Sequence, residues 1–411
     1  MKLDYKKTLL IGLGFFTVNI VWALYNISVP LDLADLGMSG VAVGSVMTID
    51  NIFAIIFLPI FGALSDKTNS RYGRRMPYLL IGIPLSALAF ILIPVMNGSL
   101  TTIMITIIAM NFFMSIYRAP TVALMPDFTP GPLRSKANGV INFMGGIGSV
   151  IAFLIGGFLI DTNEFLPFAA GSFIMVVTII VMYLMIHEPK EIAPDKPEAA
   201  EDMKVKAEEK GKVLSLIFLL LAIFSWFAGF NAIETFFSTY GTMVLGITEG
   251  QASFMLAIFS GMLVLFSIPS GFLATKIGRK KTILIGITIL FFIFLSIIFM
   301  PKDDIRLMYV ALAIGGMSWA LININSYPMV VELTSSKGIG KYTGYYYFFS
   351  MLAAIVSPIL YGFLKDMLGD GFLFIYSSIA MVVAFFFMML VQHGEAKPVA
   401  KSAFEGIEHM E

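Results

Sequence analysis

The feature that most constrains this chain is the recurrence of long apolar runs, of which the sequence contains twelve. A helix needs about 20 mainly apolar residues to cross the hydrocarbon core of a bilayer, whereas a strand needs about 10. Every run is far longer than such a strand, so we predict helices and not a barrel. The predicted spans cover residues 9–29, 40–64, 77–96, 100–124, 138–160, 166–187, 213–237, 251–273, 282–300, 306–330, 341–364 and 371–392.

Composition agrees with an all-α membrane protein. Of the residues, 58% are hydrophobic and 13% are charged, whereas soluble domains have about 45–50% and about 25%. The formal net charge is zero, which gives no indication of a nucleic-acid partner. The chain has no cysteine, which excludes disulfides and thiolate metal sites.

Basic residues are concentrated in alternate loops. If the N-terminus is cytoplasmic, the cytoplasmic segments hold 23 of the 27 Lys and Arg residues, and the opposite loops hold three. The positive-inside rule therefore predicts a multi-pass protein of the cell membrane with both termini in the cytoplasm.

A polar segment divides the chain into two sets of six spans. Its sequence, HEPKEIAPDKPEAAEDMKVKAEEKGK, is too rich in Pro, Glu and Lys to build a core. We predict an N-terminal bundle over residues 1–187, a cytoplasmic linker over 188–212 that is partly helical from Glu198, a C-terminal bundle over 213–392, and a cytoplasmic tail over 393–411. A solvated tether is favoured over a regulatory role for the linker.

The two bundles carry an internal repeat. GALSDKTNSRYGRRMP follows the second span and GFLATKIGRKKTIL follows the eighth. Gly62 aligns with Gly271 at an offset of 209, which falls to 205 after a four-residue insertion in the first copy. Repeated halves are typical of transporters that hold their substrate between the halves near mid-membrane.

Polarity inside the spans has a period of three. The first, fourth, seventh and tenth spans each carry amide or ionisable side chains, as do the second and fifth, whereas the third, sixth, ninth and twelfth have none in their interiors. Buried polar groups must face protein or water and not lipid. We therefore predict that the first, fourth, seventh and tenth spans line a cavity and that the third, sixth, ninth and twelfth face lipid.

Helical spacing places several of these side chains on shared faces. Asn19, Trp22 and Asn26 recur at i, i+3 and i+7, and Asn111 and Arg118 are seven residues apart. Amides beside tryptophans suit a neutral polyol, because hydroxyls bond to amides and a C–H face packs on indole. The alternative is that the amides join neighbouring helices. The predicted substrate-binding residues are Asn19, Trp22, Asn26, Asn51, Asn111, Arg118, Asn142, Asn231, Trp319 and Asn323.

Three ionisable side chains lie at membrane depth: Asp50, Arg118 and Glu234. A charge at mid-membrane costs about 2.5–3.5 kcal/mol on insertion scales, so these groups are expected to have a function. The Cα heights of Asp50 and Arg118 differ by about 12 Å at 1.5 Å per residue, which argues against a tight ion pair. We predict Asp50 as the proton-coupling residue in preference to Glu234. A role for Asp50 as a buried hydrogen-bond acceptor is an equal alternative.

The loop GALSDKTNSRYGRRMP resembles the G-x-x-x-D-(R/K)-x-G-R-R motif of the major facilitator superfamily. The loop has the order S-D, a four-residue insertion, S-R-x-G-R-R and then Pro, and this order resembles the loop of the sucrose and glycoside cation symporters. The ending Ala123-Leu124-Met125-Pro126-Asp127 of the fourth span is also similar to that family. Two departures stand out: Val122 occupies the position of the family's arginine, and Thr275 replaces Asp66 in the second loop copy.

This resemblance implies a gate at the cytoplasmic face. Basic residues of the loops and acids at the ends of the fourth and tenth spans would pair across the halves when that face is shut and separate when it opens. Orientation through the positive-inside rule is the alternative role of the basic residues. The predicted gate residues are Asp66, Arg71, Arg74, Arg75, Asp127, Arg279 and Glu332.

The leading prediction is a secondary active transporter that carries a sugar or glycoside, sucrose-like or maltose-like, with a proton by alternating access. Sodium-coupled symport and proton-coupled efflux of a small amphipathic compound are alternatives. An enzyme is disfavoured, because His187, His393 and His409 lie at span ends or in the tail and form no H-E-x-x-H motif. A non-transporting sensor is a further alternative. We expect no cofactor and no metal, with the small-molecule substrate, the proton and the bilayer as partners of a monomer.

Overall fold

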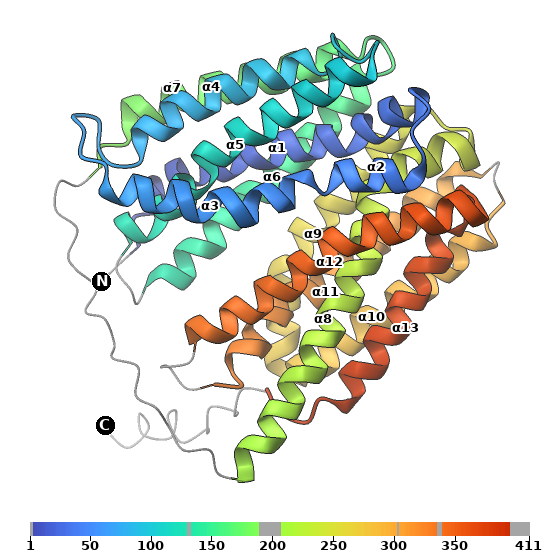
Figure 1. Ribbon diagram of the computed structural model, residues 1–411. Helices are drawn as coiled ribbons and strands as arrows, with labels where there is room; N and C mark the ends of the chain where they lie inside the picture. Colours follow the sequence, from blue (N-terminus) through green and yellow to red (C-terminus); the bar gives the residue numbers. More distant parts are fainter. Residues whose placement is uncertain (1–2, 130–132, 189–206, 302–303, 335–338, 395–411) are drawn as a thin grey trace, which may run out of the picture.

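The computed structural model describes residues 3–129, 133–188, 207–301, 304–334 and 339–394. Within these ranges the regular structure is helical throughout, as predicted, and it forms two halves of six spans each (Figure 1). Eleven of the described helical segments are long and apolar enough to cross a membrane, and one shorter apolar helix completes the first half. Most of the predicted linker and tail lies outside the described residues.

The first half contains seven helices in six spans, because the second span is divided in two. They are α1 (Tyr5–Asp35), α2 (Gly40–Met47), α3 (Ile49–Lys67), α4 (Met76–Leu92), α5 (Leu100–Phe128), α6 (Arg134–Leu159) and α7 (Phe165–Met185). The second half contains α8 (Ala207–Tyr240) with a π-helical turn (Gly241–Leu245), α9 (Glu249–Ile277), α10 (Arg279–Ile298), α11 (Ile305–Val331), α12 (Ile339–Leu368), a 3₁₀ turn (Asp370–Phe372) and α13 (Leu373–Leu390).

Several helix ends differ from the predicted spans by a few residues, for example that of α1 at Asp35 instead of 29, and two of the differences are informative. The helix α4 ends at Leu92, four residues before the predicted end of the third span at 96. Pro94 accounts for this, because it has no backbone N–H with which to continue the helical hydrogen-bond ladder. The helix α8 begins at Ala207, inside the segment predicted as linker.

The second span breaks at Thr48, which the apolar pattern did not indicate. The Thr48 hydroxyl donates to the carbonyl of Ser45 at 2.8 Å, and the Thr48 N–H bonds to the same carbonyl at 3.3 Å. A local side-chain bond of this kind competes with the regular helical ladder. The chain then restarts as α3, so Asp50 lies in the first turn of a helix at membrane depth.

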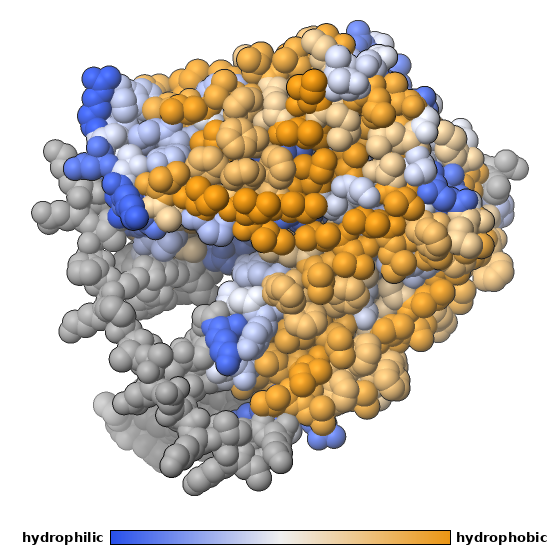
Figure 2. All heavy atoms as spheres, viewed as in Figure 1, coloured by the Kyte–Doolittle hydropathy of each residue, from blue (hydrophilic) through white to orange (hydrophobic). Residues whose placement is uncertain are grey.

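The two halves meet at one end and diverge toward the other (Figure 1). At the closed end, α2 contacts α12, and α6 contacts α9. At the open end, Figure 2 shows a hollow between the halves with hydrophilic residues along its edge. Because each half has an even number of spans, both described chain ends lie on the same side as the loop that joins α3 to α4.

Large apolar side chains cover the outer faces of the predicted lipid-facing spans. Examples that are more than half exposed are Ile81 on α4, Phe173 on α7, Phe292 on α10 and Phe386 on α13. By contrast, Trp226 on α8 and Trp319 on α11 are almost wholly buried. Exposed apolar side chains also lie on predicted interior spans, such as Ile105 on α5 and Val310 on α11, so the assignment of lipid-facing and interior spans stays a prediction.

Candidate functional site

The carboxylate of Asp50 lies at the break in the second span. It accepts a hydrogen bond from the side-chain amide of Asn51 at 2.8 Å, and the backbone N–H groups of both residues face it. The first turn of a helix offers N–H groups without intrahelical partners, and its dipole favours a negative charge there. The break therefore provides a polar setting for an acid within an apolar span.

Arg118 on α5 supplies the positive charge nearest to this acid. Its guanidinium carbon lies 6.0 Å from the centroid of the Trp22 ring, and its charge acts on the Asp50 carboxylate. The two side chains, both within the described residues, do not form a direct ion pair. Trp22 in turn meets Tyr25 edge-on at 5.5 Å, and the Asn111 side chain is a partner of the Tyr25 hydroxyl.

The opposite half contributes Glu234 from α8. The Asn26 side chain of α1 is a partner of its carboxylate, and the charge of Asp50 acts on it. The structure thus brings together the three ionisable groups at membrane depth, from three helices and both halves. Two carboxylates and one guanidinium carry a net charge of minus one when all are ionised, so one monovalent cation would neutralise the group.

Several predicted substrate-binding amides use their N–H₂ groups within their own helix. Each donates to a carbonyl four residues earlier, at 2.7 to 3.0 Å, and these residues are Asn19, Asn111, Asn142 and Asn231. Such bonds leave the amide oxygens as acceptors, and that of Asn19 accepts from Ser149 at 3.4 Å. Asn142 is exposed, Asn19, Asn231 and Asn323 are half-buried, and Asn111 is buried.

Trp319 is packed against aromatic rings in this structure, and its role in substrate binding stays a prediction. It is 1% exposed, and Phe230 stacks on it with ring centroids 4.2 Å apart and planes 6° apart. Phe227 meets the same indole edge-on at 5.5 Å. In this conformation the indole of Trp319 is packed against phenyl rings, and Trp22 is the half-buried tryptophan beside the ionisable groups.

Sequence reasoning missed the aromatic side chains of α8. Phe227, Phe230 and Glu234 follow one another at i, i+3 and i+7, so they share a face of the helix. The charge of Glu234 interacts with Asp50 of the first half, whereas Phe227 and Phe230 pack on Trp319 of their own half. The spacing of Phe227 and Phe230 relative to Glu234 could have revealed this aromatic wall.

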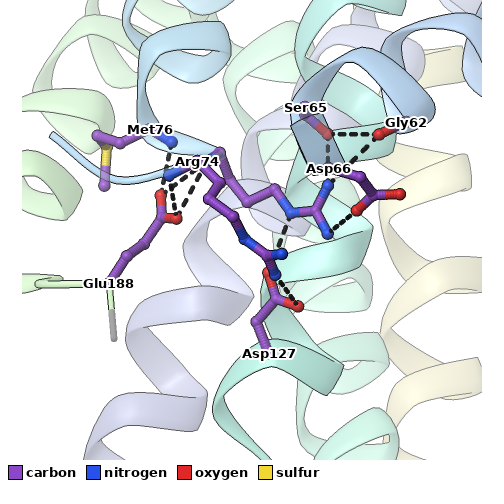
Figure 3. Close-up of polar contacts among 8 residues, drawn as sticks. Gly62, Ser65, Asp66, Arg74, Met76, Asp127 and Glu188 are labelled. Carbon is purple, nitrogen blue, oxygen red and sulfur yellow. Dashed lines mark hydrogen bonds and ion pairs between the residues drawn. The ribbon is translucent and has the colours of Figure 1, made fainter. Parts of the chain in front are cut away.

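At the open end, the predicted gate residues of the first half pair within that half (Figure 3). The carboxylate of Asp127 on α5 accepts from Arg74 at 3.1 Å and from Arg75 at 3.0 Å. Arg75 also contacts Asp66 and the hydroxyl of Ser65, each at 2.5 Å. Burial opposes the charge of Arg75, but Asp127 and Asp66 outweigh it and raise the pKa of the guanidinium above its usual value.

Glu188, which sequence reasoning did not select, completes this end of the first half. Its carboxylate accepts from the backbone N–H groups of Arg74 at 2.7 Å, Arg75 at 3.0 Å and Met76 at 2.6 Å (Figure 3). It therefore caps the N-terminus of α4 from a position about 110 residues later, which no local pattern indicates.

The second half repeats this arrangement in simpler form. Arg279, at the start of α10, pairs with Glu332 at the end of α11. Arg71 of the first half is exposed and stacks over Tyr72 at 4.6 Å. Among the described residues, none of the seven predicted gate residues forms an ion pair with the other half. Pairing across the halves in a closed state stays a prediction.

The geometry on its own shows two repeated helical halves around a polar centre. The chain matches the family model described as "Major Facilitator Superfamily" over residues 11–250 and 242–409. The chain belongs to the major facilitator superfamily. It is therefore a multi-pass membrane transporter of small molecules, and the members of this family are transporters rather than enzymes. The sucrose and glycoside branch is not distinguished by this match.

Known relatives of this superfamily member differ in what they carry. It is 24% identical over 319 residues to the class H tetracycline resistance protein of Pasteurella multocida, covering 75% of this chain and 76% of that protein. It is 24% identical over 339 residues to the uncharacterized symporter YnaJ of Bacillus subtilis, covering 75% and 72%. Among solved structures, a D-xylose-proton symporter superposes with a TM-score of 0.74 at 17% identity, covering 97% of this chain and all of that one. This last likeness shows the fold.

Proposed function

We propose that this superfamily member is a secondary active symporter that carries a sugar or glycoside together with a proton. The observation that carries the proposal is the meeting of Asp50, Arg118 and Glu234 beside the side chains of Asn26 and Trp22. This group combines acids that can exchange a proton with amide and indole groups that suit a polyol. The likeness to a named symporter and to the fold of a D-xylose-proton symporter supports it.

The coupling step follows from the charges. With both carboxylates ionised, Asp50 and Glu234 repel each other, and Arg118 compensates only one of them. A proton on one acid removes that repulsion and allows the two halves to close around the site. Because Asp50 and Glu234 come from opposite halves, rocking of the halves changes the distance between the two carboxylates. Their affinity for the proton changes with that distance. Asp50 is the primary proton site in this scheme, and Glu234 is its partner.

The orientation of the protein is also a proposal, and it rests on the positive-inside rule. The open end carries the basic loops with Arg74, Arg75 and Arg279, so it faces the cytoplasm, and the conformation is inward-open. The first-half and second-half gate residues lie at this end. When the cytoplasmic side shuts, they would approach one another across the hollow that now separates them.

Uptake into proteoliposomes tests the proposal. A panel of labelled glycosides, with and without an uncoupler, should show uptake of at least one sugar that depends on the proton gradient. Asp50→Asn should abolish gradient-driven accumulation while sugar counterflow persists, whereas Asp4→Asn, which changes an exposed acid, should have no effect. Unchanged coupled uptake in Asp50→Asn would refute the proton role.

Sodium-coupled symport and efflux are the two alternatives. Two observations speak for efflux: the likeness to a tetracycline resistance protein, and the aromatic side chains Phe227 and Phe230 of α8 that pack on Trp319. Replacing sodium with potassium at fixed pH separates the two ions. Export of an amphipathic dye from inverted vesicles, without uptake of any glycoside, would favour efflux.

A further inference from the structure

The closed end is held by a small set of polar contacts between the halves. In each of the three pairs of elements involved, a carboxylate accepts a hydrogen bond, and between α9 and α6 the Ser253 hydroxyl also donates to the carbonyl of Phe153 at 2.7 Å. Asp366 of α12 contacts the start of α2, Asp161 after α6 contacts the start of α9, and Glu249 of α9 contacts Ser28 of α1. The first two contacts have the same design, in which an acid from one half meets a helix N-terminus of the other half.

The first of these contacts joins α12 to α2. The two carboxylate oxygens of Asp366 accept from the N–H groups of Gly40 at 2.6 Å and of Val41 at 3.0 Å. Close approach of the backbones makes this possible, since a side chain at Gly40 would meet the carbonyl oxygen of Gly362 at 2.6 Å. Glycine at both positions therefore lets the acid reach the free N–H groups at the start of α2.

The second contact joins the end of α6 to α9. The carboxylate of Asp161 accepts from the N–H of Gly250 at 2.8 Å and from the hydroxyl of Thr248 at 2.6 Å. Glycine is again required at the N-terminus, because a side chain at Gly250 would lie 2.5 Å from an Asp161 oxygen. The helix begins with a residue that caps it, Thr248, whose hydroxyl also accepts from the N–H of Gln251 at 3.2 Å.

The internal repeat relates the two contacts. Val41 and Gly250 are 209 positions apart, as are the capping residues Ser39 and Thr248, and Asp161 and Asp366 are 205 positions apart. These are the two offsets found in the sequence on either side of the four-residue insertion. The contact of Glu249 with Ser28 has no counterpart, because the position matching Glu249 in the first half is Gly40. The paired contacts therefore belong to the repeated design.

We propose that Asp161 and Asp366 form two matched latches that hold the closed end shut and set the balance between the two alternating conformations. Each latch joins an acid to N–H groups that have no partner within their own helix. Opening of this end must break both latches and leave the N–H groups to water. A charge at a helix N-terminus is worth about 0.3–1 kcal/mol, which corresponds to a factor of about two to five for each latch.

A distance measurement tests the latches without any substrate, so its outcome is independent of the proposed sugar and proton. The chain has no cysteine, so spin labels can be placed at will. Labels at Val95→Cys and Phe299→Cys report the separation of the halves at the closed end, since both side chains are exposed there. The parent should give a mainly short distance with a minor long-distance population, and Asp161→Asn with Asp366→Asn should raise the ratio of long to short about four- to 25-fold.

The matched control is Asp370→Asn, because this acid lies at the same end but pairs with Lys365 of its own half at 3.1 Å. It should leave the distance distribution unchanged. Each single variant, Asp161→Asn or Asp366→Asn, should raise the ratio of long to short distances about two- to fivefold. The two single variants therefore still test the proposal if the double variant fails to fold. Distributions for both singles identical to that of the parent would overturn the proposal.

Discussion

Loss of the Asp127 carboxylate should destabilise the protein far more than loss of its counterpart Glu332. Asp127 is 9% exposed and pairs with Arg75, which is 5% exposed, and with Arg74. Glu332 and its partner Arg279 are 26% and 25% exposed. Removing one partner of a buried ion pair leaves an uncompensated charge and costs about 3–5 kcal/mol. An accessible pair is worth about 0–1 kcal/mol.

Thermal unfolding in detergent, followed by circular dichroism, compares Asp127→Asn with Glu332→Gln. We expect the first variant to lose about 3 kcal/mol, because two guanidiniums then face an amide, and the second to lose about 1 kcal/mol or less. At about 2–4 °C per kcal/mol for a bundle of this size, the melting temperatures should differ by several degrees. Equal shifts in the two variants would show that burial does not set the strength of these pairs.

Three further changes give distinct expectations. Glu188→Ala removes the cap of α4 and should cost about 1 kcal/mol of stability, which the same melting assay would register. Gly362→Ala should open the closed end in the spin-label measurement, because its new methyl group would overlap the carbonyl oxygen of Gly40, and an unchanged distance would contradict the close packing. Thr48→Ala removes the hydrogen bond from the Thr48 hydroxyl to the Ser45 carbonyl at the break in the second span. This variant should show weaker gradient-driven uptake in the transport assay. Full activity would argue against a role for the break.

Much of the fold was predictable because each membrane span forms its backbone hydrogen bonds within its own helix. A helix in lipid must satisfy its N–H and C=O groups internally, so the apolar length of a run nearly fixes the span. The position of Asn111, which is buried, also follows from the cost of polar groups in lipid. The predictions failed where local chemistry acted within a span, at the early end of α4 before Pro94 and at the break after Thr48.

The candidate site was predictable in part. The sequence selected Asp50, Arg118 and Glu234 from their charge at depth alone, and the structure places all three together. It could not show that Phe230 covers the face of Trp319. That contact joins residues on α8 and α11, and no periodicity within one helix indicates which face of another helix it will meet.

The sequence by itself determined the number of spans, the repeated halves and the presence of costly charges within the membrane, because these depend on local composition. Only the tertiary structure decided which charges meet. Glu188 caps α4, and Asp161 and Asp366 bind the N-termini of helices in the opposite half. Such contacts join positions about 90 to 325 residues apart in the chain, and those of Asp161 and Asp366 also depend on which end of the two halves is closed.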